Sequence, residues 1–278
     1  VCGCSAGGTY FGILPQFHKN FIGLQYYYRQ FETQHTSIAE PKEFTSHETF
    51  KTIELRMRLN ITRKLQLLTF LPFGLNKQTE RNTTNTIEGL GDVTLIANYS
   101  LYNNGDSLLH LWKHNLQIGG GIKLPIGKYK QLNKDGVLNP NIQVGTGSTD
   151  FILHAIYTIR RKKVGCNTNM QYRLTSTNTN SYKFGDRVSL TSNVFYWANV
   201  LGFSVLPNIG MSYEYAAKDK HQKILLPNSR GQNIVATIGT DFYIKQFALA
   251  LGYQHPMHQN SPIIKQKSRI STTLLINF

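Results

Sequence analysis

Apolar and polar residues alternate along much of this chain with a period of two, in segments of about ten residues. In the segment 53–61, one set of alternate positions is wholly apolar, and the other carries Glu54, Arg56 and Arg58. Because successive side chains of a β-strand point to opposite faces, this segment predicts a strand with an apolar side and a charged side. The same alternation recurs in the segments 91–103, 108–127 and 247–258.

About twelve strands of this kind can be drawn along the chain. Short turns alternate with long polar loops, which is typical of outer-membrane barrels, whose short turns are periplasmic. The pattern predicts an all-β fold, an antiparallel transmembrane up-and-down β-barrel over residues 20–278, with both chain ends in the periplasm. The predicted strands are 20–33, 49–62, 64–76, 91–103, 108–127, 149–161, 164–177, 186–198, 201–216, 233–245, 247–258 and 267–278. The predicted short turns lie near Arg63, Asn104–Gly105, Lys162–Lys163, Asn199 and Gln246, and the long loops span about 34–48, 77–90, 128–148, 178–185, 217–232 and 259–266.

The composition agrees with a membrane barrel. Charged residues make up 16% of the chain and aromatic residues 12%, whereas about a quarter of the residues in soluble domains are charged. A barrel accounts for this mixture, because its lipid-facing positions are apolar and its lumen positions are polar without needing charge. The chain has no run of about 18 apolar residues, which excludes a transmembrane helix. A soluble β-sandwich or enclosed-ligand barrel is the alternative, since its strands also alternate.

The net charge of +15 raises nucleic-acid binding as a candidate function. The Lys and Arg residues, however, are scattered singly along the chain, and Arg160–Lys163 is their only dense group. A protein that reads nucleic acid usually gathers its basic residues on one face or in one motif. We therefore expect no nucleic-acid partner.

Aromatic residues gather near the ends of predicted strands, as at Tyr26–Tyr28 and Tyr196–Trp197, where membrane barrels place rings at headgroup depth. The last predicted strand alternates apolar residues up to Phe278, which resembles the C-terminal signal read by the barrel-assembly machinery. We therefore expect the bacterial outer membrane as the location, with its lipid, its lipopolysaccharide and the barrel-assembly machinery as partners. A start at Val1 fits a mature form whose secretion signal has been removed.

The polar faces of the predicted strands define the residues that would line the lumen. Basic residues outnumber acidic ones on these faces, so the lumen is predicted to be net positive and, if open, to favour anions. Alternatively, these side chains pair with the acids and with a plug, because a barrel of about twelve strands has a narrow lumen. The predicted lumen-lining residues are Arg29, Arg56, Arg58, Lys113, Lys123, Arg173, Arg187, Lys245 and Arg269, with the acids Glu54, Glu214 and Asp241.

The N-terminal segment 1–19 has no evident strand partner. Its Cys2 and Cys4 could chelate copper or zinc, with His18 as a further ligand. The alternatives are a redox-labile disulfide and a segment anchored through cysteines near a removed signal. The aromatic residues of this periplasmic segment need burial, so it could fold into the lumen as a plug or bind a partner protein.

Enzymatic activity is not expected. His110 and His114 fall on one face of a predicted strand, about 13 Å apart, which is too far for joint ligation of a metal. His154 is predicted to face the lumen with no nucleophile beside it. The sequence has no Gly-x-Ser-x-Gly elbow, P-loop, dinucleotide fingerprint, calcium loop or zincin motif.

Three short motifs occur in a familiar order: Gly89–Asp92, Lys123–Gly127 and Gly145–Asp150. In this order they resemble the outer-membrane transporter family of the meta-pathway of phenol degradation, best from about residue 65 to 157. The resemblance implies an outer-membrane β-barrel that serves as a channel for small, often hydrophobic molecules. The N-terminal cysteine segment departs from the family's usual pattern, and fold transfers better than substrate.

The leading hypothesis is a passive outer-membrane channel or transporter for small solutes, whose basic lumen, open or plugged, governs access. A second hypothesis is a non-conducting structural subunit of an outer-membrane protein complex, which would hold partners through its long loops or N-terminal segment. A third is copper or zinc handling by the N-terminal Cys-x-Cys segment.

Overall fold

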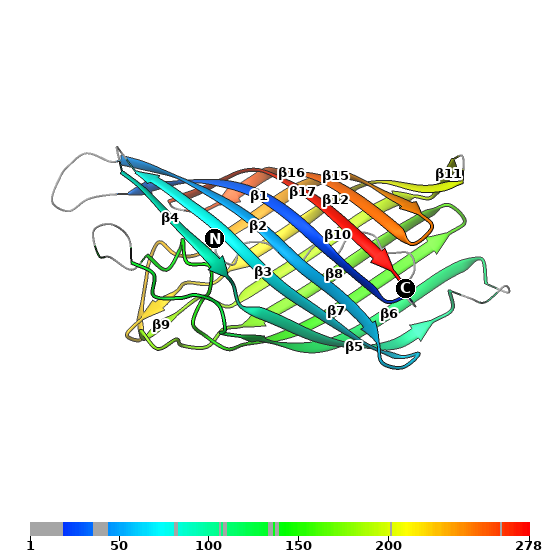
Figure 1. The fold of residues 1–278 in the computed structure, drawn as a ribbon, viewed down its shortest axis with the longest axis horizontal. Coiled ribbons are helices and arrows are strands. Elements are labelled where there is room, and N and C mark those ends of the chain that lie inside the picture. Colours follow the sequence, from blue (N-terminus) through cyan, green and yellow to red (C-terminus); the bar gives the residue numbers. More distant parts are fainter. Residues whose placement is uncertain are drawn as a thin grey trace.

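The computed structural model describes residues 19–35, 44–80, 83–105, 107, 110–132, 136, 139–200, 202–261 and 263–278. These residues form a closed, twelve-stranded antiparallel barrel with tilted strands, as the sequence predicts (Figure 1). Two consecutive strands, β4 and β5, together make one wall strand, because both pair with β3. The wall consists of β1 (Phe21–His35), β2 (Phe44–Asn60), β3 (Leu65–Glu80), β4 (Thr83–Leu90), β5 (Val93–Asn103), β6 (Trp112–Leu124), β7 (Asp150–Arg161), β8 (Val164–Leu174), β10 (Arg187–Tyr196), β12 (Phe203–Ala216), β15 (Gly231–Ile244), β16 (Phe247–Asn260) and β17 (Ile264–Asn277). The shorter strands are β9 (Tyr182–Lys183), β11 (Ala198–Val200), β13 (Lys220–His221) and β14 (Ile224–Leu225).

The first and last strands close the barrel. β1 pairs with β17 in register from Phe21↔Asn277 onward, and the two strands run side by side in Figure 1 in blue and red. The backbones of Asn20 and Phe278 exchange hydrogen bonds of 3.2 and 3.0 Å. Both described chain ends therefore lie at the end of the barrel that carries the short turns, and we call the opposite end the long-loop end.

The two faces of the wall differ in polarity. Large apolar side chains on alternate positions are exposed on the outside, as along β16 at Leu249, Leu251 and Tyr253. The inward positions hold polar side chains such as Gln25 and Asn98, which are no more than 1% exposed. This arrangement inverts the usual burial preference and is the one expected of a barrel whose solvent on the outside is lipid. Among the described residues, no helix is long and apolar enough to span a membrane.

Three predicted loops at the long-loop end are partly or largely strand instead. β2 begins at Phe44, β3 and β4 pair from Phe73↔Leu90 to Glu80↔Thr83, and only residues 261–263 separate β16 from β17. These extensions are mostly polar on both sides, with exceptions such as Ile87 and Leu90, so the alternation of apolar residues in them is weak. Threonine-rich strands nevertheless pair well, because β-branched side chains suit the pleated backbone. The loops predicted at 34–48, 77–90 and 259–266 are therefore much shorter than expected.

One predicted short turn is longer than expected. The sequence predicts a strand from residue 108, but β6 begins at Trp112. Asn104 caps this connection: its Nδ2 donates to the Trp112 carbonyl oxygen (3.1 Å), and its Oδ1 accepts from the His114 N–H (2.5 Å). His110 consequently lies outside the strand, in contrast to its predicted position on one face with His114.

Candidate functional site: the barrel lumen

The β6–β7 connection, residues 125–149, folds into the long-loop end of the barrel. Its Ile142 is 1% exposed and packs in an apolar cluster with side chains from β1, β2, β4 and β12. Asn76 Nδ2 on β3 donates to the Ile142 carbonyl oxygen (2.8 Å), and Asn139 Nδ2 donates to Gln78 Oε1 (3.2 Å). The described part of this connection therefore fills part of the lumen. The other members of the cluster are Phe31, Phe50, Ile87 and Ala216.

An ion-pair network anchors this connection to the wall. Lys123 Nζ lies 3.1 Å from Asp92 Oδ2 and 2.9 Å from Asp150 Oδ2, and all three side chains are almost fully buried. The N–H groups of Gly127 and Thr146 donate to the Asp92 carboxylate at 3.1 and 2.8 Å. Two carboxylates surround one ammonium, so Lys123 adds no net positive charge to the lumen. The three motifs that carry the family resemblance meet at this Asp92–Lys123–Asp150 network.

Arg56 and Glu54 form a buried pair on the inner face of β2. Arg56 is 2% exposed, and its Nε donates to Glu54 Oε1 at 2.7 Å. The guanidinium also donates to the Tyr27 hydroxyl and lies 5.5 Å from the centre of the Phe70 ring. These contacts hold the arginine against the wall, because a guanidinium satisfies both a carboxylate and aromatic faces.

Arg269 and Glu214 form a second buried pair, between β17 and β12. Both terminal nitrogens of Arg269 donate to the two Glu214 oxygens at 2.7 Å, and Arg269 Nη2 also donates to Gln266. Because β15 and β16 separate these strands in the sheet, the pair spans the inner surface of two intervening strands. Bidentate pairs of this kind are strong and geometrically specific.

At two places in the wall, an arginine on one strand lies directly opposite an arginine on the neighbouring strand. Arg29 on β1 is in register with Arg269 on β17, and Arg173 on β8 is in register with Arg187 on β10. Arg29 Nη2 donates to Thr52 Oγ1 at 3.2 Å. Like charges directly opposite each other destabilise a sheet, so these positions carry a cost that other contacts must offset.

The other predicted lumen residues lie towards the short turns. Arg58 Nε donates to the Lys19 carbonyl oxygen at 2.9 Å, Asp241 is 2% exposed on the inner face of β15, and Lys113 is half-buried on the inner face of β6. Lys245 instead lies exposed in the β15–β16 turn with a φ of 53°. Its strand ends at Ile244, so the strand parity that placed Lys245 in the lumen does not apply.

Two of the described histidines, His154 and His114, have hydrogen-bond partners on other strands. His154 is buried in the lumen, with Nδ1 2.9 Å from Asn98 Oδ1 and Nε2 3.1 Å from Asn169 Nδ2. On the outer face, His114 Nδ1 is 2.8 Å from the Tyr157 hydroxyl. Within the described ranges, no three His, Cys, Asp or Glu side chains gather in a way that could hold a metal ion. The predicted metal ligands Cys2, Cys4 and His18 lie outside the described residues.

The short-turn end of the lumen is partly apolar, which sequence reasoning missed. Six buried side chains form a cluster there, with the Trp197 ring packed against it. The alternation in the sequence places these six residues on the inner faces of their strands, and this could have revealed the cluster. The cluster was missed because the inner faces were expected to be polar. All six side chains are buried, and burying apolar surface away from water is favourable. The cluster comprises Phe21, Phe195, Leu206, Tyr243, Ala248 and Leu275.

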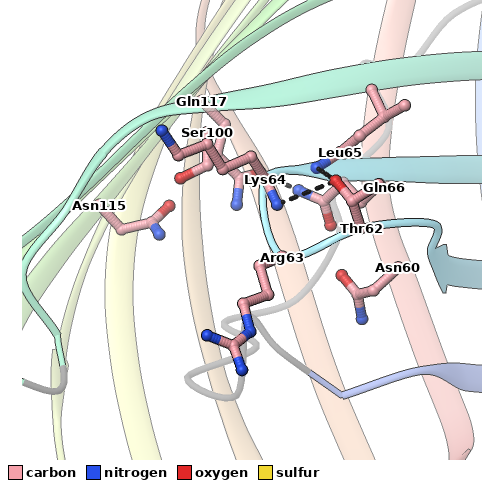
Figure 2. Close-up of a pocket in the computed structure, with 9 residues that line it drawn as sticks. All are labelled: Asn60, Thr62, Arg63, Lys64, Leu65, Gln66, Ser100, Asn115 and Gln117. Atoms are coloured by element: carbon pink, nitrogen blue, oxygen red, sulfur yellow. Dashed lines mark hydrogen bonds between the residues drawn. The ribbon is translucent and has the colours of Figure 1, made fainter.

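A polar recess lies beside this end, between the β2–β3 turn and strands β5 and β6 (Figure 2). Gln66 donates to Gln117 across its wall. Neither amide atom of Asn115 has a hydrogen-bond partner in the described structure, although the residue is 4% exposed. Arg63 and Lys64 border the recess in Figure 2 and leave it basic at its rim. A water molecule would suit the unpartnered amide.

No family model matches the sequence, and no curated protein matches it either. An outer membrane channel from Pseudomonas putida F1 has a TM-score of 0.71 at 14% identity, covering 94% of this chain and 95% of that chain. The β domain of the Bordetella autotransporter BrkA has a TM-score of 0.51 at 10% identity, covering 94% of this chain and 99% of that domain. Likenesses at such low identity concern the fold. This chain shares the fold of a closed antiparallel β-barrel with that outer membrane channel.

Proposed function

We propose that the protein is an outer-membrane channel through which small solutes pass passively along a basic lumen. The observation that carries this proposal is the closed barrel with an apolar outer face and a polar inner face that bears buried arginines. The likeness to an outer membrane channel over nearly the whole chain supports it. Passage needs no energy source, because solutes would diffuse past side chains fixed on the wall.

The proposed orientation places the short turns and both described chain ends in the periplasm. Bacterial outer-membrane barrels have short periplasmic turns and longer loops outside, and this chain has the same asymmetry. The β6–β7 connection would then constrict the outer mouth. Lipid would contact the apolar outer face, and the last strand, ending at Phe278, would be the one that the assembly machinery reads.

The family resemblance supports the architecture of the outer mouth more than a solute. Its motifs supply Asp92, Lys123, Gly127 and Asp150, which build the network that anchors the infolded connection. These residues are buried in contacts with one another, so a phenolic solute does not follow from them. Arginine, asparagine and glutamine on the wall favour polar or anionic solutes, because such side chains replace the hydration of polar groups.

We further propose that residues 1–19 form a partial plug, which narrows the lumen from the periplasmic side without sealing it. The apolar cluster defined above faces the lumen next to Asn20, where β1 begins. Arg58, on the inner face of β2, holds the Lys19 carbonyl oxygen, which directs the preceding chain towards the lumen. The apolar and aromatic residues of the N-terminal segment would cover the cluster.

The channel function is tested by swelling of proteoliposomes in isosmotic arabinose. The folded protein should accelerate swelling, and heat-denatured protein should not. Vesicles that contain the inserted barrel and swell no faster than empty vesicles would contradict a channel and favour the non-conducting subunit.

The plug is tested by deleting residues 1–19. The deletion should raise single-channel conductance in planar bilayers above that of the intact barrel, because it would widen the short-turn end. Unchanged conductance of a correctly inserted barrel would contradict the plug.

A further inference from the structure

Within the described structure, three arginines lie on the inner faces of β8, β10 and β17. Arg173 and Arg187 are in register on β8 and β10, and Arg269 lies on β17. The Glu214 carboxylate on β12 binds Arg269, and Glu214 lies two residues along β12 from Ala216, the register partner of Arg187.

That carboxylate is already engaged. Both Glu214 oxygens accept hydrogen bonds from Arg269 at 2.7 Å, and the Glu54 carboxylate of β2 is engaged with Arg56. Neither acid makes a hydrogen bond to Arg187. Arg187 therefore feels a nearby negative charge but has no carboxylate oxygen bound to its nitrogens.

Two of the three donor nitrogens of Arg187 are buried and have no hydrogen-bond acceptor among the described residues. Its Nε and Nη1 have no hydrogen-bond partner within the described structure, and the Nε of Arg269 has none either. A buried charged donor without an acceptor costs free energy, typically more than a neutral one. A second arginine directly opposite, Arg173, raises this cost by like-charge repulsion. A negatively charged oxygen group at this position would offset both costs.

We infer that the inner surface beside Arg187 is a binding subsite for the oxyanion group of a small solute. Arg187 would donate to the carboxylate or phosphate oxygens, and Arg173 and Arg269 would supply further positive charge. The subsite rests on the proposed channel function and names the class of solute that the channel would favour. Oxyanions suit it better than chloride, because the planar guanidinium presents several donors to separate oxygen atoms.

The test measures anion binding to the full barrel in detergent micelles at constant ionic strength set with sodium chloride. Acetate is followed by saturation-transfer NMR of its methyl group, and inorganic phosphate by ³¹P line broadening. At least one anion should bind the wild type saturably, and Arg187→Gln should weaken it by roughly tenfold or more. Saturation by acetate alone identifies a carboxylate site, and saturation by phosphate alone identifies a phosphate site.

Lys64→Gln is the matched control, because Lys64 is an exposed cation in the turn between β2 and β3 at the other end of the barrel. This variant should bind as the wild type does. Heat-modified gel mobility confirms that each variant is folded. Non-saturable binding of both anions to the wild type, or equal affinity of wild type and Arg187→Gln, would overturn the inference.

This binding experiment does not require conduction. A barrel that binds an oxyanion through Arg187 but stays silent in bilayers would contradict the channel and leave the subsite standing. A conducting barrel without saturable oxyanion binding would contradict only the subsite.

Discussion

Replacing Lys123 with methionine should destabilise the barrel strongly. The Lys123 side chain is 4% exposed and contacts Asp92 and Asp150, whose side chains are 4% and 3% exposed. Methionine keeps most of the volume and removes the charge, which leaves two buried carboxylates without their cation. Breaking a buried ion pair on one side costs about 3–5 kcal/mol, and we expect the free energy of unfolding to fall by that amount. Urea unfolding of the barrel in lipid vesicles, followed by tryptophan fluorescence, measures this change.

The control for this prediction is Lys64→Met, which removes an exposed turn lysine and should change the free energy of unfolding by no more than about 0.5 kcal/mol. Adding Asp92→Asn and Asp150→Asn to Lys123→Met should recover part of the loss, because the network then carries no uncompensated charge. The Lys123→Met barrel should also be cut by trypsin in the β6–β7 connection. A loss no larger than that of Lys64→Met would contradict a stabilising role for the Asp92–Lys123–Asp150 network.

Three further substitutions test packing in the lumen. A Cβ at Gly119 would lie 2.8 Å from the Asn98 Cα, whereas one at Gly120 would lie 3.6 Å from the nearest atom. Gly119→Val should therefore lower the free energy of unfolding by roughly 1–3 kcal/mol, and Gly120→Val should not; equal free energies of unfolding for the two variants would contradict this. Arg269→Gln should cost roughly 3–5 kcal/mol by isolating Glu214, and adding Glu214→Gln should restore part of it in a double-mutant cycle. Ile142→Ala should speed proteolysis of the β6–β7 connection, since a buried isoleucine truncated to alanine costs about 2–5 kcal/mol; an unchanged rate would count against the infolded connection.

The strands and the barrel could be predicted because the lipid-facing positions repeat with the period of a strand. That repeat also assigned the faces within a strand, as at Arg56, Glu214 and Arg269, which the structure places inside. The repeat of apolar residues stops where the strands extend beyond the part of the wall whose outer face is apolar. The polar hairpin of β3 and β4 therefore looked like a loop in the sequence, although its residues pair throughout.

The partners of the lumen residues could not be predicted, because a strand's own pattern says nothing of its neighbours across the barrel. Lys123 was expected to add positive charge, but the infolded connection brings Asp92 and Asp150 to it. Arg269 and Glu214 pair across the inner surface of two intervening strands, β15 and β16, so their contact depends on the order of strands around the barrel. These contacts follow from barrel closure and from the path of one long connection, which no local pattern encodes.

Single-channel recording of the purified protein in a planar bilayer under a potassium chloride gradient tests whether the barrel conducts through a basic lumen. We expect discrete conductance steps with a reversal potential that reports a higher permeability to chloride than to potassium. A silent bilayer with confirmed insertion, or a preference for potassium, would contradict a conducting barrel with a basic lumen.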